Sequence, residues 1–231
     1  THGTDTIEET GYFLNLVVKT KKPVVLTAAM RPSTALSADG PLNFYNAVAV
    51  AANKDAAGRG VLVVVNDWIH GASSLTKAST TAVQTFLSPL RGLVGVVAYG
   101  EAEFYRGPVG RNTLDSEFSL DGVTALPRVD IVMAHANMDG AMIDGAAAAG
   151  AKGIVIAGVG NGNMTKAGLD ALAAQAKKGV VCVRSSRVVT GRVGRNVEVD
   201  DDKLGLVASD DLNPQKARTL LRLALLKPRS L

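Results

Sequence analysis

The sequence predicts an α/β fold with parallel sheets, divided into a larger N-terminal domain and a smaller α/β C-terminal domain. Apolar residues make up 47% of the 231 residues, which is enough for a sizeable core. Aromatic residues contribute only 4%, while valine, alanine and glycine are abundant, as is typical of valine-rich strands beneath alanine-rich helices. Short apolar runs also alternate with helical patterns, which favours right-handed crossovers between parallel strands.

The first series of predicted elements forms the N-terminal domain. Its first helix begins at Thr6, because Thr6 and Glu9 have the spacing of a capping box. Pro41 suits the first turn of a second helix. In chain order, residues 1–105 are expected to contain a helix over 6–19, a strand over 23–27, a helix over 41–52, a strand over 60–66, and a hairpin over 93–105 around Gly100.

A linker and a second series of elements follow. Residues 106–127 lose all periodicity and collect Pro, Gly, Asn and Asp, which predicts a linker. Asn213 can cap a last helix that has Pro214 at its first position. The C-terminal domain, residues 128–231, is expected to contain strands over 129–133, 153–157 and 180–183, and helices over 141–149, 165–178 and 214–226.

Charge and cysteine content narrow the classes of partner. The net charge is +4 and the basic residues are scattered, without runs interleaved with aromatics, so we expect no nucleic-acid partner. Cys182 is the only cysteine, which excludes an intrachain disulfide and cysteine-based zinc sites, and its apolar neighbours predict a buried, inert thiol. His2, His70 and His135 show no metal-ligand spacing. No apolar run is long enough to span a membrane, so we expect no membrane partner.

Reactive groups are concentrated at the start of the chain. The hydroxyl of Thr4 is followed at once by the carboxylate of Asp5, and both are expected at a helix N-terminus, where backbone N–H groups favour anions. Because a threonine hydroxyl is a poor nucleophile without a base, a partner is needed. Lys77, in a polar segment after a valine strand, is the candidate, since a buried lysine beside hydroxyls can lose its proton. A plain helix cap and an ordinary surface lysine are the alternatives.

Two loops in the second half invite further interpretations. The segment Gly158-Val159-Gly160-Asn161-Gly162-Asn163 lacks the third glycine of a dinucleotide fingerprint, and no ribose-binding acid follows, so we predict no nicotinamide cofactor. Its glycines indicate that the backbone approaches something closely, either a ligand that Asn163 faces or only its own turn. The acidic run over 198–202 suggests a solvated loop. Metal binding, or one carboxylate that binds a cationic amino group, is the alternative.

Six stretches of sequence carry a resemblance to a known family. They are THGTDTIEET, AMRPSTALSADGP, LTKAST, GVGNGN, VRSSR and LNPQKAR, and they span the chain in the family's order. The chain thereby resembles the bacterial type II L-asparaginases and the related glutaminase-asparaginases. The resemblance implies a flavodoxin-like parallel sheet in the N-terminal domain. It also implies an amidohydrolase that releases ammonia from the side-chain amide of asparagine or glutamine through a threonine acyl-enzyme, without a cofactor.

The resemblance assigns roles to the groups near the start of the chain. Thr4, Asp5 and Lys77 correspond to the family's second catalytic triad. Thr4 would position and activate the attacking water or itself attack, while Lys77 tunes its proton and Asp5 helps to bind the substrate's α-amino group. Ala29 falls where a backbone carbonyl holds the amide nitrogen of the substrate.

Other roles implied by the resemblance involve more than one subunit. Asn163 and Glu198 correspond to substrate-binding residues that a neighbouring subunit contributes, with Glu198 reaching the α-amino group. The implied assembly is a homotetramer of intimate dimers, and the implied location is periplasmic or secreted.

Three functions remain open. The family's first signature, a Thr-Gly-Gly-Thr-like segment with the primary nucleophile, is not found in the sequence, which also lacks an initiator methionine, so we expect the N-terminal domain to be incomplete at its start. The first function is an asparaginase or glutaminase-asparaginase, with its preference for either amide undecided. The second is a catalytically incompetent fragment or subunit that only associates with another chain. The third is a hydrolase that uses Thr1 as an N-terminal nucleophile.

Overall fold

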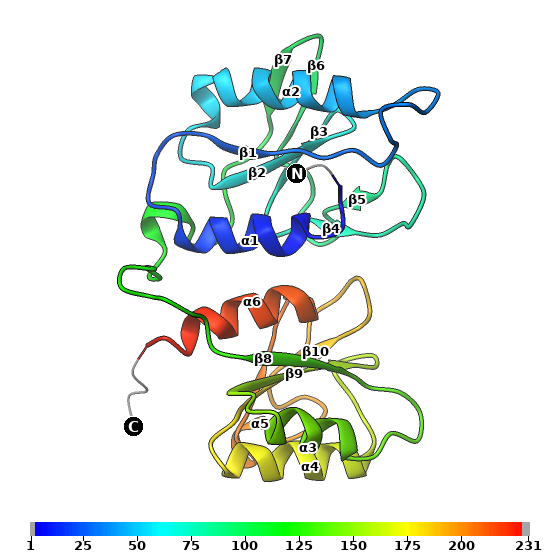
Figure 1. Ribbon diagram of the computed structural model, residues 1–231, viewed down its shortest axis with the longest axis vertical. Helices are drawn as coiled ribbons and strands as arrows, with labels where there is room; N and C mark the ends of the chain where they lie inside the picture. Colours follow the sequence, from blue (N-terminus) through cyan, green and yellow to red (C-terminus); the bar gives the residue numbers. More distant parts are fainter. Residues whose placement is uncertain (1–2, 228–231) are drawn as a thin grey trace. The chain divides into compact units, whose positions relative to one another are not determined.

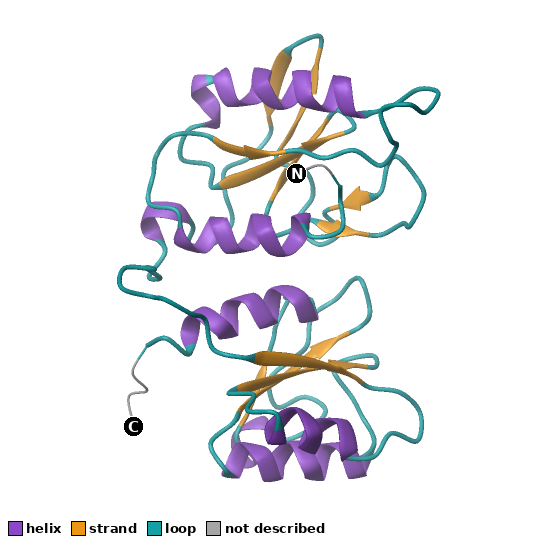
Figure 2. Cartoon of the chain, in the orientation of Figure 1, coloured by secondary structure: helices purple, strands orange, loops and turns teal. Residues whose placement is uncertain are grey.

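A computed structural model of the chain describes residues 3–227, and it confirms the α/β class (Figures 1 and 2). Two compact units are present, one ending at Leu120 and the other beginning at Asp121. Each unit has its own sheet with helices on both faces. Because each sheet is covered on two sides, one interior strand in each, β2 (Val61–Val65) and β9 (Gly153–Gly158), is buried throughout rather than on alternate residues.

The sheet of the N-terminal unit is mixed rather than wholly parallel. Only β1 and β2 pair in parallel, while the hairpins β2–β3 and β6–β7 add antiparallel strands. Tyr99 and Gly100 both have positive φ in the β6–β7 turn, as a tight hairpin requires. The strand order is β1 (Val24–Leu26), β2 (Val61–Val65), β3 (Trp68–Gly71), β6 (Gly95–Ala98) and β7 (Glu101–Phe104), with β4 (Thr76–Lys77) and β5 (Phe86–Leu87) as a separate pair.

Strand β2 divides the core of this unit into two halves. Successive side chains of a strand point to opposite faces. Leu62 and Val64 therefore pack beneath α2 (Gly40–Ala52), whereas Val63 and Val65 pack with Ile7 of α1 (Ile7–Val17). All five residues of β2 are buried. The unit also contains the 3₁₀ turns η1 (Lys54–Ala56) and η2 (Thr113–Asp115).

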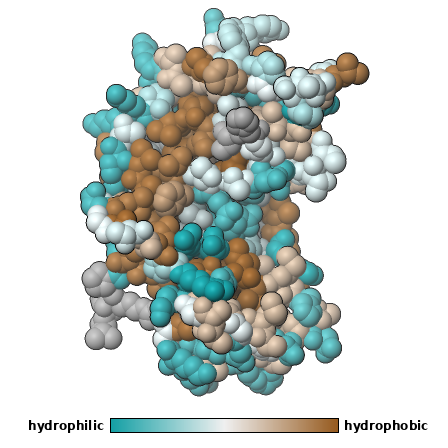
Figure 3. Space-filling view, viewed as in Figure 1, coloured by the Kyte–Doolittle hydropathy of each residue, from teal (hydrophilic) through white to brown (hydrophobic). Residues whose placement is uncertain are grey.

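Strand β1 forms one edge of the N-terminal sheet. No strand of residues 3–227 pairs with its outer side, and its residues are only half-buried. Figure 3 shows apolar atoms, in brown, spread over the face of this unit on which β1 lies in Figure 1. Native proteins normally cover or blunt apolar edge strands, because an uncovered edge can pair with another strand.

The C-terminal unit contains the parallel sheet. Helices α3 and α4 cover one face, where Ile154 and Ile156 are buried, and α6 covers the other face beside Val155. The strand order is β11 (Leu206–Ala208), β10 (Val181–Ser186), β9 (Gly153–Gly158) and β8 (Val129–Met133), and the helices are α3 (Ala141–Ala148), α4 (Lys166–Lys177), α5 (Asp201–Leu204) and α6 (Pro214–Ala224). Cys182 is fully buried in this unit, and burial raises the pKa of its thiol to about 12, as an inert cysteine requires.

The predicted capping box at Thr6 is wrong. Thr6 makes no side-chain capping bond in the described structure, because its backbone (φ −106°, ψ 5°) is not extended. Thr165, with ψ 158°, does accept the N–H of Gly168, and the predicted cap at Asn213 accepts the N–H of Lys216. No helix within residues 3–227 is long and apolar enough to cross a bilayer.

Part of the predicted linker packs against α1. Lys19 donates to the carbonyls of Thr113 and Ser116, and the Ser116 hydroxyl donates to the Leu16 carbonyl. Asn112, Thr113 and Ser116 are all buried. These contacts fasten the segment to the N-terminal unit although its sequence has no periodicity.

Candidate active site

Thr4 and Asp5 form the turn that leads into α1. The Thr4 carbonyl accepts the N–H of Ile7 at 3.4 Å, and the fully buried Ile7 anchors the start of the helix. Thr4 is 5% exposed, whereas the side chain of Asp5 is 91% exposed. The turn therefore holds one hydroxyl inside the protein and presents the neighbouring carboxylate to solvent.

Lys77 lies against this turn. Its strand β4 pairs with β5, where Lys77 faces the buried Phe86. The ammonium nitrogen Nζ donates to Thr4 Oγ1 at 2.8 Å and to Asp5 Oδ1 at 2.7 Å. Only 22% of the Lys77 side chain is exposed. The structure thus brings the three predicted side chains together, although Lys77 lies more than 70 positions from the other two in the sequence.

The Thr4 hydroxyl has a second partner of an unusual kind. Its proton points at Met30 Sδ, 3.3 Å away, while its oxygen accepts the bond from Lys77. A thioether sulfur is a weak acceptor. A water or substrate oxygen that enters the site can therefore replace Met30 as the acceptor at little cost.

Lys77 also sets the charge of Asp5. The hydrogen bond from Lys77, and then its positive charge, hold the pKa of Asp5 below its ordinary value despite the opposing effect of desolvation. Asp5 is therefore held in its ionised form by Lys77. Since Lys77 occupies only Oδ1 and the side chain is open to solvent, Oδ2 is available to a cationic group of a ligand.

Ala29 lies in the loop that follows β1, next to Met30. The Ala28 carbonyl before it accepts the side-chain N–H of Asn43 at 2.9 Å, and the Met30 N–H after it donates to Asp39 at 2.9 Å. Within residues 3–227, no hydrogen bond reaches the carbonyl oxygen of Ala29 itself. The peptide is therefore held on both sides while its oxygen stays available to a ligand.

Asp39 and Asn43 hold the loop of the candidate site, and the sequence interpretation did not identify them. Asp39 accepts the backbone N–H groups of Met30 and Arg31, and Asn43 bonds both Asp39 and the N–H of Asn66. The SADGP stretch contained the signal, since it was part of the resemblance but had no stated role. These two side chains fix the Ala29 loop to the N-terminus of α2.

Asn163 and Glu198 lie in the C-terminal unit, so the structure does not place them relative to Thr4. Asn163 is partly buried at the end of a turn closed by two backbone bonds with Val159, of 2.8 and 2.9 Å. Glu198 is exposed in the loop before α5. Their predicted role in substrate binding stays a prediction.

The glycine loop of this unit approaches an arginine. A side chain at Gly162 would place a Cβ 3.0 Å from Arg184 Nη1 and 2.8 Å from a methyl of Val193. One at Gly158 would lie 2.6 Å from the backbone of Gly162. The close approach predicted from the glycines is therefore present, and its partners in the structure are residues of the same unit.

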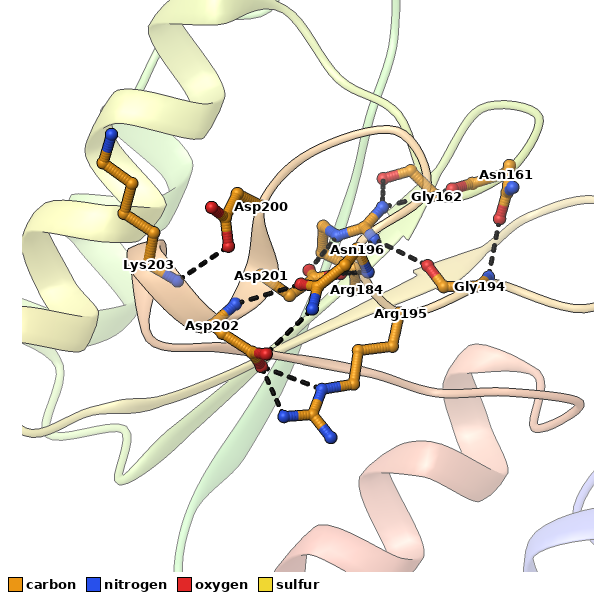
Figure 4. A network of polar contacts seen from close by, with 10 residues as sticks. All are labelled: Asn161, Gly162, Arg184, Gly194, Arg195, Asn196, Asp200, Asp201, Asp202 and Lys203. Carbon is orange, nitrogen blue, oxygen red and sulfur yellow. Dashed lines mark hydrogen bonds and ion pairs between the residues drawn. The ribbon is translucent and has the colours of Figure 1, made fainter.

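The acidic run is only partly a solvated loop, which corrects the simpler prediction. Asp201 is fully buried and bonds the guanidinium of Arg184 at 2.6 and 2.7 Å (Figure 4). Burial alone would raise the pKa of Asp201, but hydrogen bonds from Arg184 and the Asn196 N–H, with the charge of Arg184, lower it below its ordinary value. Asp200 caps α5, and Asp202 bonds Arg195 and Asn196. Among residues 3–227, no three His, Cys, Asp or Glu side chains gather as metal ligands.

Comparison with known proteins agrees with the resemblance. The family description "Asparaginase, N-terminal" matches residues 1–110, and "Glutaminase/Asparaginase C-terminal domain" matches residues 128–231. The chain is 54% identical over 225 residues to a "Probable L-asparaginase periplasmic" of Haemophilus influenzae, which covers 97% of this chain and 64% of that protein. It is 47% identical over 230 residues to a "Glutaminase-asparaginase" of Acinetobacter glutaminasificans, covering 98% of this chain and 69% of that protein.

The chain belongs to the asparaginase/glutaminase family. An "L-asparaginase 2" of Escherichia coli is 52% identical over 97% of this chain and 65% of its own length. The chain thus spans slightly less than two thirds of the length of several such relatives. The contact of Lys77 with Thr4 and Asp5 joins an amine, a hydroxyl and a carboxylate, the three groups that the resemblance assigns to one triad.

Proposed function

We propose that this chain is part of an amidohydrolase that converts the side-chain amide of L-asparagine, and of L-glutamine, to the acid and ammonia. The contact of Lys77 with Thr4 and Asp5 carries the proposal. A hydroxyl with a nearby amine can pass a proton, and a nearby carboxylate can bind the substrate's ammonium group. Membership of the asparaginase/glutaminase family supplies the reaction, and the names of three relatives supply the two substrates.

Each group has one role in the proposed reaction. The hydroxyl oxygen of a threonine attacks the amide carbon, and the proton that this hydroxyl loses passes to the amide nitrogen, which then leaves as ammonia. Water then attacks the acyl carbon and gives up a proton to Thr4 Oγ1, whose own proton passes on through Lys77 Nζ to the first threonine. The acid is released as the first threonine recovers its proton. One water is consumed for each ammonia released.

Substrate binding follows from the same contacts. The free oxygen of Asp5 accepts the α-ammonium group, and the Ala29 carbonyl accepts the amide N–H, since its oxygen has no other bond within residues 3–227. Asn163 and Glu198 complete the site of a neighbouring copy, Glu198 at the α-ammonium group. This role requires the homotetramer of intimate dimers that the resemblance implies, and the name of one relative supports a periplasmic location.

The primary nucleophile comes, in this proposal, from a segment outside the 231 residues. The outer edge of β1 supports the idea, because it is apolar, half-buried and unpaired in the described structure. A further strand added in parallel there would end near the loop that follows β1, which contains Ala29 and Met30. In α/β sheets, ligands bind at the carboxyl ends of the strands.

The test measures ammonia release from L-asparagine and L-glutamine. Three proteins are compared: the 231-residue chain, the chain extended at its N-terminus by the first strand and Thr-Gly-Gly-Thr segment of a relative, and the extended chain with Lys77→Met. Lys166→Met is the matched control, because Lys166 forms an exposed ion pair with Asp170 on α4. We expect activity in the extended chain and its control, with a large loss in Lys77→Met.

Two outcomes would contradict the proposal. A folded extended chain that releases no ammonia would favour the non-catalytic subunit. Activity that disappears when the terminal amine of the 231-residue chain is blocked would favour Thr1, which lies outside the described residues.

A further inference from the structure

Arg184 is a completely buried cation at the centre of the C-terminal unit. Its side chain is 1% exposed in β10, and that of Asp201 is not exposed at all. The guanidinium meets both oxygens of Asp201 at 2.6 and 2.7 Å (Figure 4). Such a two-bonded pair is rigid, because the planar guanidinium and the carboxylate fit in one orientation.

The remaining donors of Arg184 hold two separate loops. Nη1 donates to the carbonyls of Asn161 and Gly162, at 3.1 and 3.2 Å, and Nη2 donates to the carbonyl of Gly194 at 3.2 Å. A further bond joins the loops directly, since the Gly194 N–H donates to Asn161 Oδ1 at 2.9 Å. One side chain therefore fastens the loop after β9 to the loop before α5 (Figure 4).

Each of these loops carries one candidate substrate-binding residue. Asn163 directly follows Gly162, whose carbonyl Arg184 holds. Glu198 comes two residues after Asn196, whose N–H donates to Asp201 Oδ2 at 2.8 Å. The attachment points are thus one and two residues away from the groups that would contact the amino acid.

We infer that Arg184 is a positioning residue, which together with Asp201 fixes the loop of Asn163 relative to the loop of Glu198. The inference rests on the proposed function, because Asn163 and Glu198 matter together only if both bind the amino-acid substrate. It adds a residue that neither contacts the substrate nor takes part in the proton transfers.

Gly162 shows how tightly the loop fits against the arginine. Its φ is +76°, and a Cβ there would lie 3.0 Å from Arg184 Nη1, 2.8 Å from Val193 and 3.3 Å from the Ser185 carbonyl. Gly160, two residues earlier, also has a positive φ of +50°, but a Cβ there would meet nothing within 4 Å. Gly160→Ala is therefore a matched control for Gly162→Ala, since both strain the backbone and only one displaces the loop from Arg184.

A double substitution separates positioning from stability. Buried ion pairs can often be replaced by apolar side chains of similar size without loss of stability. Methionine at 184 and leucine at 201 fill this space, but neither can donate to the three loop carbonyls. Arg184→Met/Asp201→Leu is thus expected to fold with its two loops joined only by the direct bond from Gly194 to Asn161, without the bonds from residue 184.

The experiment measures the order of the two loops and the affinity for ligand separately. Amide hydrogen exchange is measured at Asn163 and Gly194, whose acceptors, the Val159 carbonyl and Asn161 Oδ1, the substitutions leave in place. Affinity for L-aspartate, the reaction product, is measured by calorimetry on the extended chain, with KM and kcat for L-asparagine. The proteins are wild type, Arg184→Met/Asp201→Leu, Gly162→Ala and Gly160→Ala.

We expect the double variant and Gly162→Ala to exchange faster at both amides and to bind L-aspartate about tenfold or more weakly, since misplacement by an ångström can cost that much. KM should rise while kcat stays close to wild type, because the lost contacts serve binding. Gly160→Ala should match wild type.

Wild-type exchange and affinity in the folded double variant, or in Gly162→Ala, would overturn the inference. Failure of the proposed function is distinguishable, because wild-type extended chain would then neither bind L-aspartate nor release ammonia. In that case the exchange rates alone decide whether Arg184 ties the two loops.

Discussion

Substitution of Arg184 alone should destabilise the C-terminal unit strongly. In Arg184→Met, the fully buried Asp201 loses both guanidinium bonds and keeps only the Asn196 N–H and its own short helix as support. Three loop carbonyls lose their donor as well. Removing one partner of a buried ion pair costs about 3–5 kcal/mol, because the other charge remains buried without its counter-ion.

The expected change in thermal stability follows from this figure. For a unit of roughly 110 residues, each kcal/mol lowers the midpoint by about 4 °C, so Arg184→Met should melt about 12–20 °C below wild type. Arg184→Met/Asp201→Leu should recover most of that difference, because it leaves no unpaired charge. The exposed pair of Arg192 and Asp210 provides the control: Arg192→Gln should change the midpoint by less than about 3 °C, since exposed pairs contribute little.

Cys182 allows the unfolding of this unit to be measured by itself. It is the only cysteine, and it is fully buried in β10, next to Arg184 in the same strand. A thiol reagent therefore labels the chain only when the C-terminal unit opens. Labelling after a short pulse at increasing temperature or urea concentration gives the midpoint of that unit, while circular dichroism reports both units together.

The effect should also depend on pH with a defined sign. Asp201 has a lowered pKa in the folded protein, so the pair contributes stability above the unfolded-state pKa, about 3.9, and that contribution is lost as the pH falls through the folded-state pKa. In Arg184→Met the buried carboxyl takes up a proton more readily. The stability difference between the two proteins should therefore shrink as the pH falls from 7 to about 3. A loss below about 1 kcal/mol at pH 7, or a difference that grows in acid, would refute this account.

Three further substitutions test the N-terminal unit. Lys77→Met should lower kcat for ammonia release about 10²–10⁴-fold, which is the range of general acid–base catalysis. It should also raise the pKa of Asp5 in a carboxyl ¹³C titration, because the hydrogen bond that lowers this pKa is gone. An unchanged kcat would remove Lys77 from the mechanism. Gly95→Ala should lower the free energy of unfolding in urea by about 3 kcal/mol, because its Cβ would lie 2.0 Å from the Glu103 carbonyl oxygen. Gly107→Ala is the control, because a Cβ at that position would meet nothing within 4 Å. Asn43→Ala should lower the free energy of unfolding by about 1–3 kcal/mol in the same assay, because the buried Ala28 carbonyl and the Asn66 N–H lose their hydrogen-bond partner. It should also raise KM, because the loop that contains Ala29 is no longer held in place. An unchanged KM would argue against Ala29 as a substrate contact.

Strong local patterns predicted most of the helices and strands. The apolar runs of β2, β8 and β9 appear within one residue of their predicted bounds, as does the helix with Pro41 in its first turn. Short strands such as β3 and β11 were not predicted, since runs of three or four residues show too little alternation or apolar length to be distinguished from a loop. The antiparallel β3 is also the reason why the N-terminal sheet is mixed and not wholly parallel.

The candidate site also contains parts that the sequence predicted and parts that it did not. The hydroxyl and carboxylate before α1 could be found in the sequence, because Thr4 and Asp5 are adjacent and the helical pattern begins directly after them. Their contact with Lys77 was a hypothesis from chemistry and resemblance, since spacing cannot show that a hairpin brings an amine to that turn. Asp39 and Asn43 were missed because what they bind is mostly backbone, and a hydrogen bond to backbone leaves no pattern of paired side chains in the sequence.

Arg184 is the clearest case of a role that sequence alone conceals. Arginine is rarely fully buried, and Arg184 follows the strand predicted over 180–183, so nothing around it indicated a charge inside the protein. Two features of the sequence pointed indirectly to this buried charge: a glycine loop that was predicted to approach another group closely, and an acidic run that was predicted to be a solvated loop. Both have one physical explanation, since Gly162 leaves room for the guanidinium and Asp201 neutralises it. A buried charge of this kind costs desolvation, and in this unit the guanidinium compensates for that cost by donating two hydrogen bonds to Asp201 and three to loop carbonyls.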